Sequence, residues 1–70
     1  MSLQKAKELA LEFDLVTPLR LVGKTEDEVR DIIIEEVTQM KKVFEDALHD
    51  GVDTFDDIEG CNDVLEELDA

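Results

Sequence analysis

Apolar residues follow one another at steps of three or four through the middle of the chain. Between residues 25 and 50 this pattern has the period of an α-helix. The main members of its apolar face are Val29, Ile33, Val37, Met40 and Phe44. With its flanking apolar residues, the face covers nearly half of the helix circumference at about 100° per residue. A helix this broadly apolar needs neighbours on more than one side. We therefore predict a long central helix that is covered by another helix of the chain and by a second subunit.

Both ends of the central helix carry recognisable signals. Thr25 is followed three residues later by Glu28, which is the spacing of a capping box. Acidic residues fill the first turn, where the helix dipole favours negative charge. Gly51 follows Asp50 and can take the left-handed conformation that often ends a helix. These signals set the expected bounds at 25–50.

A shorter helix is predicted over residues 2–14, with Ser2 as its N-cap. Its apolar face contains Leu3, Ala6, Leu9, Ala10 and Phe13. Pro18 prevents the helix from continuing and favours an extended conformation just before it. Residues 15–24 are therefore predicted to be a linker. Apolar and polar residues alternate briefly over residues 19–22, which could indicate a short strand. An extended linker is favoured, because the chain offers no second strand to pair with it.

Residues 53–69 are predicted to form two short acidic helices. Asp53 is expected to cap the first helix, and Asn62 the second. The expected packing residues are Phe55 and Ile58 in the first and Val64, Leu65 and Leu68 in the second. Together with the two preceding helices, this gives an all-α fold in a single domain, residues 1–70.

A chain of 70 residues has a small core that supplies only a few kcal/mol. Cys61 is the single cysteine and His49 the single histidine, so neither an internal disulfide nor a zinc cluster is expected. Self-association is the remaining common source of stability. The predicted homodimer interface consists of Val29, Ile33, Glu36, Val37, Met40 and Phe44.

Glu36 is the one carboxylate inside the apolar arc of the central helix. A buried carboxylate without a partner is costly. We therefore expect Glu36 either to reach solvent at the edge of the arc or to pair with a lysine or arginine across a subunit interface. Its role as an acid, base or ligand would need a second catalytic group, which the sequence does not supply.

The acidic residues are concentrated in the second part of the chain. The formal net charge is −13; residues 1–42 hold seven bases and nine acids, a net of −2, whereas residues 43–70 hold eleven acids and no lysine or arginine, a net of −11. Such a field repels nucleic acids and anionic membranes and attracts basic surfaces. The candidate partner-binding residues are Asp53, Asp56, Asp57, Glu59, Asp63, Glu66 and Glu67.

These features favour a non-enzymatic, acidic protein-binding module. It would dock on a basic surface of a partner protein, as an inhibitor or as a mimic of nucleic acid. One alternative is a structural homo-oligomer whose acidic end only keeps it in solution. Another is an oligomer that binds a small anion or nucleotide between subunits. The basic residues available for that anion are Arg20, Lys24 and Arg30.

No motif for catalysis, a cofactor or a metal is recognised. Ser2 is the only serine, and Pro18 occupies the place of the first glycine in a P-loop that would end at Gly23 and the two residues after it. A calcium loop with Gly60 at its sixth position would place Phe55 first, where a ligand is required. The first residues lack the apolar core of a signal peptide, and no apolar run is long enough to span a membrane. We therefore expect a cytoplasmic protein.

Overall fold

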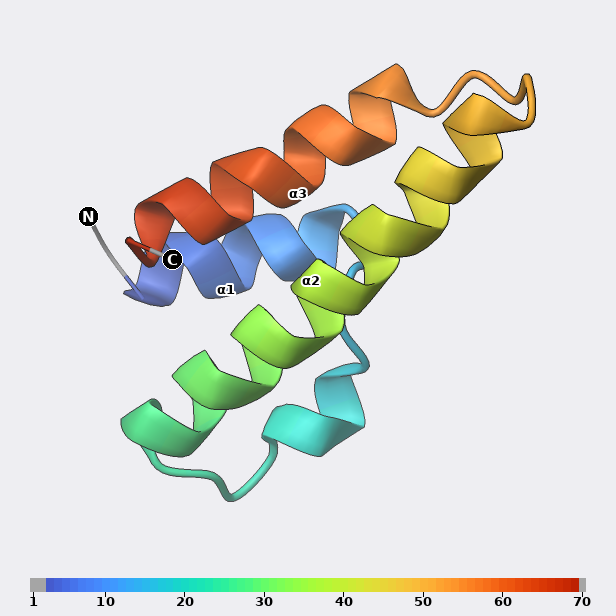
Figure 1. Ribbon diagram of the computed structural model, residues 1–70. Helices are drawn as coiled ribbons and strands as arrows, with labels where there is room; N and C mark the ends of the chain where they lie inside the picture. Colours follow the sequence, from blue (N-terminus) through green and yellow to red (C-terminus); the bar gives the residue numbers. More distant parts are fainter. Residues whose placement is uncertain (1–2, 70) are drawn as a thin grey trace.

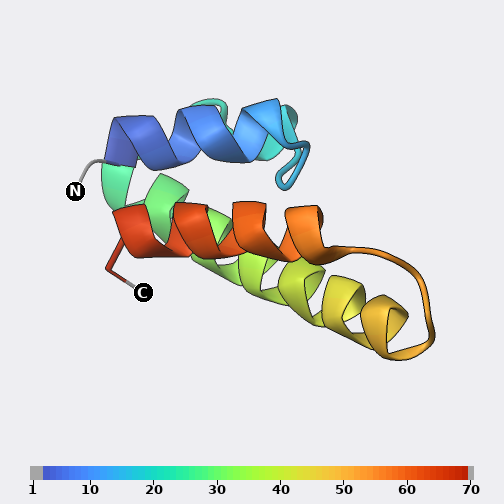
Figure 2. The ribbon, with the colours of Figure 1, turned by 90° about the horizontal axis from the view of Figure 1, so that it is seen from above.

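The computed structural model describes residues 3–69, and over this range the protein is all-helical, without strands. Its elements are α1 (Leu3–Glu12), the short 3-10 helix η1 (Pro18–Leu21), α2 (Glu26–His49) and α3 (Phe55–Glu67) (Figure 1). α2 and α3 form an antiparallel pair that is joined by a short turn. The view from above shows α1 and α3 side by side, while α2 crosses α3 and its C-terminal half lies on the side of α3 away from α1 (Figure 2). The all-α fold with a long central helix is therefore confirmed.

The N-terminus of α2 has the predicted capping box. The Thr25 hydroxyl accepts a hydrogen bond from the backbone N–H of Glu28 at 3.2 Å, and the Glu28 carboxylate accepts one from the backbone N–H of Thr25 at 3.1 Å. These two bonds lower the pKa of the Glu28 carboxyl. The bond from the Thr25 backbone N–H has the larger effect and the bond with the Thr25 side chain the smaller one. After the helix, Gly51 has a φ of +97°, which favours glycine and lets the chain turn back toward α3.

The prediction of two short helices after residue 53 is wrong, because α3 is one continuous helix that passes through Gly60 and Asn62. Gly60 is buried, and a Cβ atom there would lie 3.1 Å from Cδ2 of Phe13. The glycine therefore lets the ring of Phe13 approach the helix and does not interrupt it. Asn62 is an exposed residue within the helix and caps nothing.

The start of α3 also differs from the prediction. Its N-cap residue is Thr54, whose buried hydroxyl donates a hydrogen bond to the carbonyl of Phe44 in α2. Asp53 instead accepts a hydrogen bond from the backbone N–H of Phe55 at 3.4 Å. The side chain of Phe55 is 67% exposed, so its predicted packing role is wrong. The Thr54 side chain thus connects the beginning of α3 to α2. The sequence pattern of helix caps does not predict this contact.

The predicted extended linker is also wrong in part, because residues 18–21 form the 3-10 helix η1. Pro18 stands at the first turn of η1, where its missing N–H and fixed φ are tolerated. The helical turn directs Leu21 into the core, and the preceding Leu15 and Val16 are buried as well. The connection between α1 and α2 is therefore part of the core.

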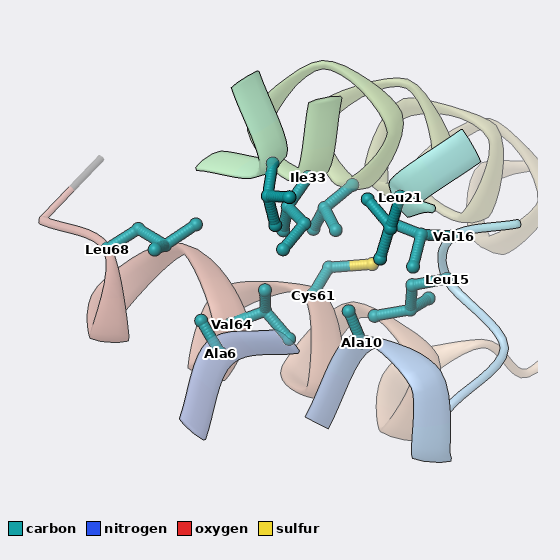
Figure 3. Close-up of a cluster of buried hydrophobic side chains, with 11 residues drawn as sticks. Ala6, Ala10, Leu15, Val16, Leu21, Ile33, Cys61, Val64 and Leu68 are labelled. Carbon is teal, nitrogen blue, oxygen red and sulfur yellow. The ribbon is translucent and has the colours of Figure 1, made fainter. Parts of the chain in front are cut away.

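The core lies where α1, α3, η1 and the first two-thirds of α2 meet (Figure 3). Cys61 lies in the middle of the cluster and is fully buried together with Ile33, Val37 and Val64. The fully buried residues of α1 are Ala6 and Ala10, whose small side chains let α1 pack closely on α3. The predicted cap of α1, Ser2, lies outside the described residues.

Glu36 fastens η1 and the chain before it to α2. One carboxylate oxygen, Oε1, pairs with the guanidinium of Arg20 at 2.5 Å, and the other, Oε2, accepts a hydrogen bond from the backbone N–H of Thr17 at 3.2 Å. The Glu36 side chain is 18% exposed, and that of Arg20 is about half exposed. The basic partner of Glu36 therefore comes from the same chain, and the expected partner across a subunit interface is not needed.

We predict that Glu36→Ala lowers the free energy of unfolding by about 1–2 kcal/mol, since both a charge-assisted hydrogen bond and a backbone hydrogen bond are lost. Arg20→Ala should cost less, because this guanidinium is half exposed. Urea denaturation of the two single variants and the double variant gives their coupling, which should be about 0.5–1 kcal/mol. Strictly additive effects would show that the ion pair contributes nothing.

Candidate protein-binding surface

The carboxylates of α3 are gathered on the side of the helix that faces away from the core. They recur at steps of three and four, so they share one helix face. Its members, hereafter the α3 acidic face, are Asp56, Glu59, Asp63, Glu66 and Glu67. From Asp56 to Glu66 there are ten steps along the helix, which correspond to a row about 15 Å long at a rise of about 1.5 Å per residue. The opposite face carries Cys61, Val64 and Leu68, which are buried.

The structure brings together most, but not all, of the acidic residues that the sequence nominated. Asp53 precedes the helix, and its carboxylate accepts a hydrogen bond from the backbone N–H of Phe55. Asp57 is exposed but lies in line with the buried side of α3, at the helix start. Glu67 is partly buried and forms an ion pair with Lys5 of α1 at 3.9 Å. The exposed row available to a partner therefore centres on Asp56, Glu59, Asp63 and Glu66.

Three of the six residues predicted for a subunit interface are buried within the single chain. Val29, Ile33 and Val37 belong to the core, and Glu36 binds the α1–α2 connection of its own chain. The two remaining members, both partly buried, are Met40 and Phe44. Contact of all six residues with a second subunit would require the core to open. The part of α2 that a second subunit can reach lies toward its C-terminus.

Two of the three basic residues nominated for a small anion have other partners. Arg20 is held by Glu36, and Arg30 donates a hydrogen bond to the backbone carbonyl of Leu68 at 3.0 Å. Lys24 borders a separate depression of about 280 Å³ between the beginnings of α1 and α2. Because the two guanidinium groups are already engaged at different places, the structure offers no reason to prefer the anion-binding alternative.

An apolar depression at the turn between α2 and α3 was not foreseen from the sequence. It has a volume of about 290 Å³ and is lined by Leu48, Gly51, Val52, Asp53 and Phe55. Phe55 was expected to be a packing residue of the first short helix. The signal that could have revealed this surface is Val52, an apolar residue in a turn between two acidic segments.

Cys61 is a fully buried titratable group with charged residues nearby. Burial is the main cause that raises the pKa of its thiol, and the negative charge of Asp57 raises it further. A thiol in such surroundings is a poor nucleophile at neutral pH. Among residues 3–69 there is no group of three or more His, Cys, Asp or Glu side chains that could hold a metal ion. Over the same range, no helix is long and apolar enough to cross a membrane.

Fold and surface together define a small all-α protein that has three α-helices within residues 3–69 and an acidic outer face on α3. Comparisons with protein-family models, with characterised proteins and with solved structures gave no match for this chain. The functional argument therefore depends on the geometry and charge of the surfaces described above.

The raised pKa of Cys61 leads to a prediction about alkaline stability. Above the ordinary thiol pKa of about 8.5 the unfolded chain releases a proton that the folded chain keeps. The contribution of this thiol to the free energy of unfolding is fully present below that pH. It is lost as the pH rises toward the pKa of the thiol in the folded chain, with a slope of at most about 1.4 kcal/mol per pH unit. Urea denaturation between about pH 7 and 10 should show this decline in the wild type and not in Cys61→Ala. Parallel stability curves for the two proteins would contradict it.

Proposed function

We propose that this protein is a non-enzymatic binding module whose α3 acidic face docks on a basic surface of a partner protein. The observation that carries this proposal is the division of α3 into two faces. Its inner face is fixed in the core by Cys61, Val64 and Leu68, while its outer face presents a row of carboxylates. The charges are therefore held in place before binding, which reduces the entropy lost when a partner is bound.

The sign and the linear form of the row support mimicry of nucleic acid. Carboxylates three or four residues apart are separated by about 4.5–6 Å along the helix axis. One strand of duplex DNA carries a phosphate about every 3.4 Å along its axis. The row is less dense than a phosphate backbone but has the same sign and a similar linear form. A lysine- and arginine-lined groove that binds nucleic acid is the partner surface with the matching charge.

In this role the protein is an inhibitor that occupies the groove in place of the nucleic acid. The expected setting is the cytoplasm, where such partners work on nucleic acid. Direct binding to nucleic acid or to an anionic membrane is disfavoured by the net charge of −13. The oligomeric state does not enter this proposal, because the α3 acidic face belongs to a single chain.

The proposal predicts that Asp56→Asn, Glu59→Gln and Asp63→Asn together weaken partner binding by about 3- to 100-fold, as expected for three exposed charges. The measurement is affinity capture from a cell extract with the immobilised protein at low and high salt. Captured proteins should elute with added salt and with duplex DNA, and more readily with DNA than with polyglutamate of equal total charge.

A matched control removes three charges elsewhere: Glu8→Gln, Asp31→Asn and Glu35→Gln. These residues are exposed and lie on α1 and α2. The control should capture the same proteins as the wild type, because its α3 row is intact. Equal capture by the wild type and the α3 variant, or equal loss in both variants, would contradict docking through the α3 acidic face.

We also propose a second role, homodimerisation, which an apolar strip on the C-terminal half of α2 favours. Met40, Val43 and Ala47 share one helix face, and Val43 is 58% exposed. This half of α2 extends beyond α1 (Figure 1). In this role the protein is a structural oligomer whose acidic end keeps it in solution. The two roles are compatible, since α3 and this strip are different surfaces.

The dimer predicts that Val43→Glu yields a monomer, because it places a charge in the centre of the interface. Sedimentation velocity at micromolar concentration measures the change, and circular dichroism should show that the helices are kept. Leu19→Glu is the control, since Leu19 is exposed on η1, outside the strip. A wild-type protein that already sediments as a monomer would rule out this role.

A further inference from the structure

The turn between α2 and α3 exposes two large apolar side chains next to each other. Phe55 is 67% exposed and Val52 is 55% exposed, and with Leu48 they line the depression of about 290 Å³. Isolated apolar residues on a surface are ordinary. Here they are grouped around one depression, and none of the neighbouring helices of the described chain covers them. We call Leu48, Val52 and Phe55 the turn surface.

Carboxylates flank the turn surface along the chain. Asp53 lines the depression. Asp50 comes directly before Gly51, and Asp56 comes directly after Phe55, both of which also line it. Glu59 stands one helical turn after Phe55 on α3 and is exposed. No lysine or arginine occurs from residue 43 onward. The turn surface is therefore an apolar patch with a rim of negative charge.

A second copy of this chain is a poor occupant for such a patch. Symmetric contact would bring two acidic turns together, and the segment of residues 43–70 carries a net charge of −11 in each. Like charges facing each other oppose association. The complementary occupant has an apolar centre and positive charges at its sides, which are the features of a cationic amphipathic helix.

We propose that the turn surface binds a cationic amphipathic helix of the partner protein. Apolar side chains of that helix lie on Phe55 and Val52, and its flanking lysines or arginines pair with Asp50, Asp53 and Asp56. Buried aromatic residues at the centre of an interface usually contribute most of its affinity, while rim charges contribute orientation and rate. This inference rests on the proposed function and specifies the class of partner segment: it needs apolar residues as well as charge.

The test uses three synthetic helical peptides of equal length. The first combines leucine and lysine in an amphipathic pattern, the second replaces each leucine by serine, and the third replaces each lysine by glutamate. Binding to the full chain is measured by fluorescence anisotropy and mapped by amide chemical shifts. The leucine–lysine peptide should bind at least about tenfold more tightly than the serine–lysine peptide, and the leucine–glutamate peptide should not bind.

Two double variants locate the binding. Val52→Thr with Phe55→Ser should reduce the affinity for the leucine–lysine peptide to that for the serine–lysine peptide. Leu19→Ser with Val22→Thr removes one exposed apolar residue within η1 and one directly after it. This variant should leave the affinity unchanged. All four side chains are exposed, so both variants should keep the helical circular dichroism spectrum of the wild type.

The outcomes separate this inference from the proposed function. Equal binding of the two lysine peptides, or an unchanged affinity after substitution of Val52 and Phe55, would overturn the apolar anchor while docking by charge stands. Failure of both lysine peptides to bind would count against the proposed function as well. Sedimentation that shows a wild-type dimer lost on substitution of Val52 and Phe55 would assign the surface to a second copy and overturn the inference.

Discussion

The carboxylate of Glu36 is the point on which the arrangement of the helices depends. It binds the guanidinium of Arg20 and the backbone N–H of Thr17, and so holds the connection between α1 and α2 against α2. The residues around this connection, Leu15, Val16 and Leu21, form one wall of the core. The Glu36 carboxylate lies on an apolar helix face, and it gives the polar groups of the connection between α1 and α2 a partner on that face. In the first part of α2, where Val29, Ile33 and Val37 are buried, the chain's own connection helps to cover the apolar face.

The position of α3 follows from contacts of a different kind, in which small residues permit close approach. α1 meets α3 through Ala6 and Ala10, and Phe13 lies over Gly60. The hydroxyl of Thr54 fastens the beginning of α3 to α2. With its inner side held in this way, α3 turns Asp56, Glu59, Asp63 and Glu66 toward solvent. The packing of the inner face therefore fixes the direction of the acidic outer face.

The sequence was sufficient where a signal is local and was insufficient where the answer depends on a contact far along the chain. The capping box at Thr25 and the periodic apolar face of α2 set the long helix correctly. The break predicted before Asn62 is absent, because Gly60 is compatible both with a break and with a close neighbour, and only the position of Phe13 decides between them. The partner of Glu36 and the exposure of Phe55 depend in the same way on how elements meet. A helical wheel gives a direction for each side chain and does not say what lies there.

The two faces of α3 place different demands on substitution over evolutionary time. Positions such as Gly60, Cys61 and Val64 are limited by volume, since each is enclosed by neighbouring side chains. Asp56, Glu59, Asp63 and Glu66 are not limited by packing, because they are exposed to solvent. Related chains are therefore free to exchange outer residues one at a time without loss of the fold. A lineage carrying this scaffold can acquire a new partner by changes confined to a single side of one helix.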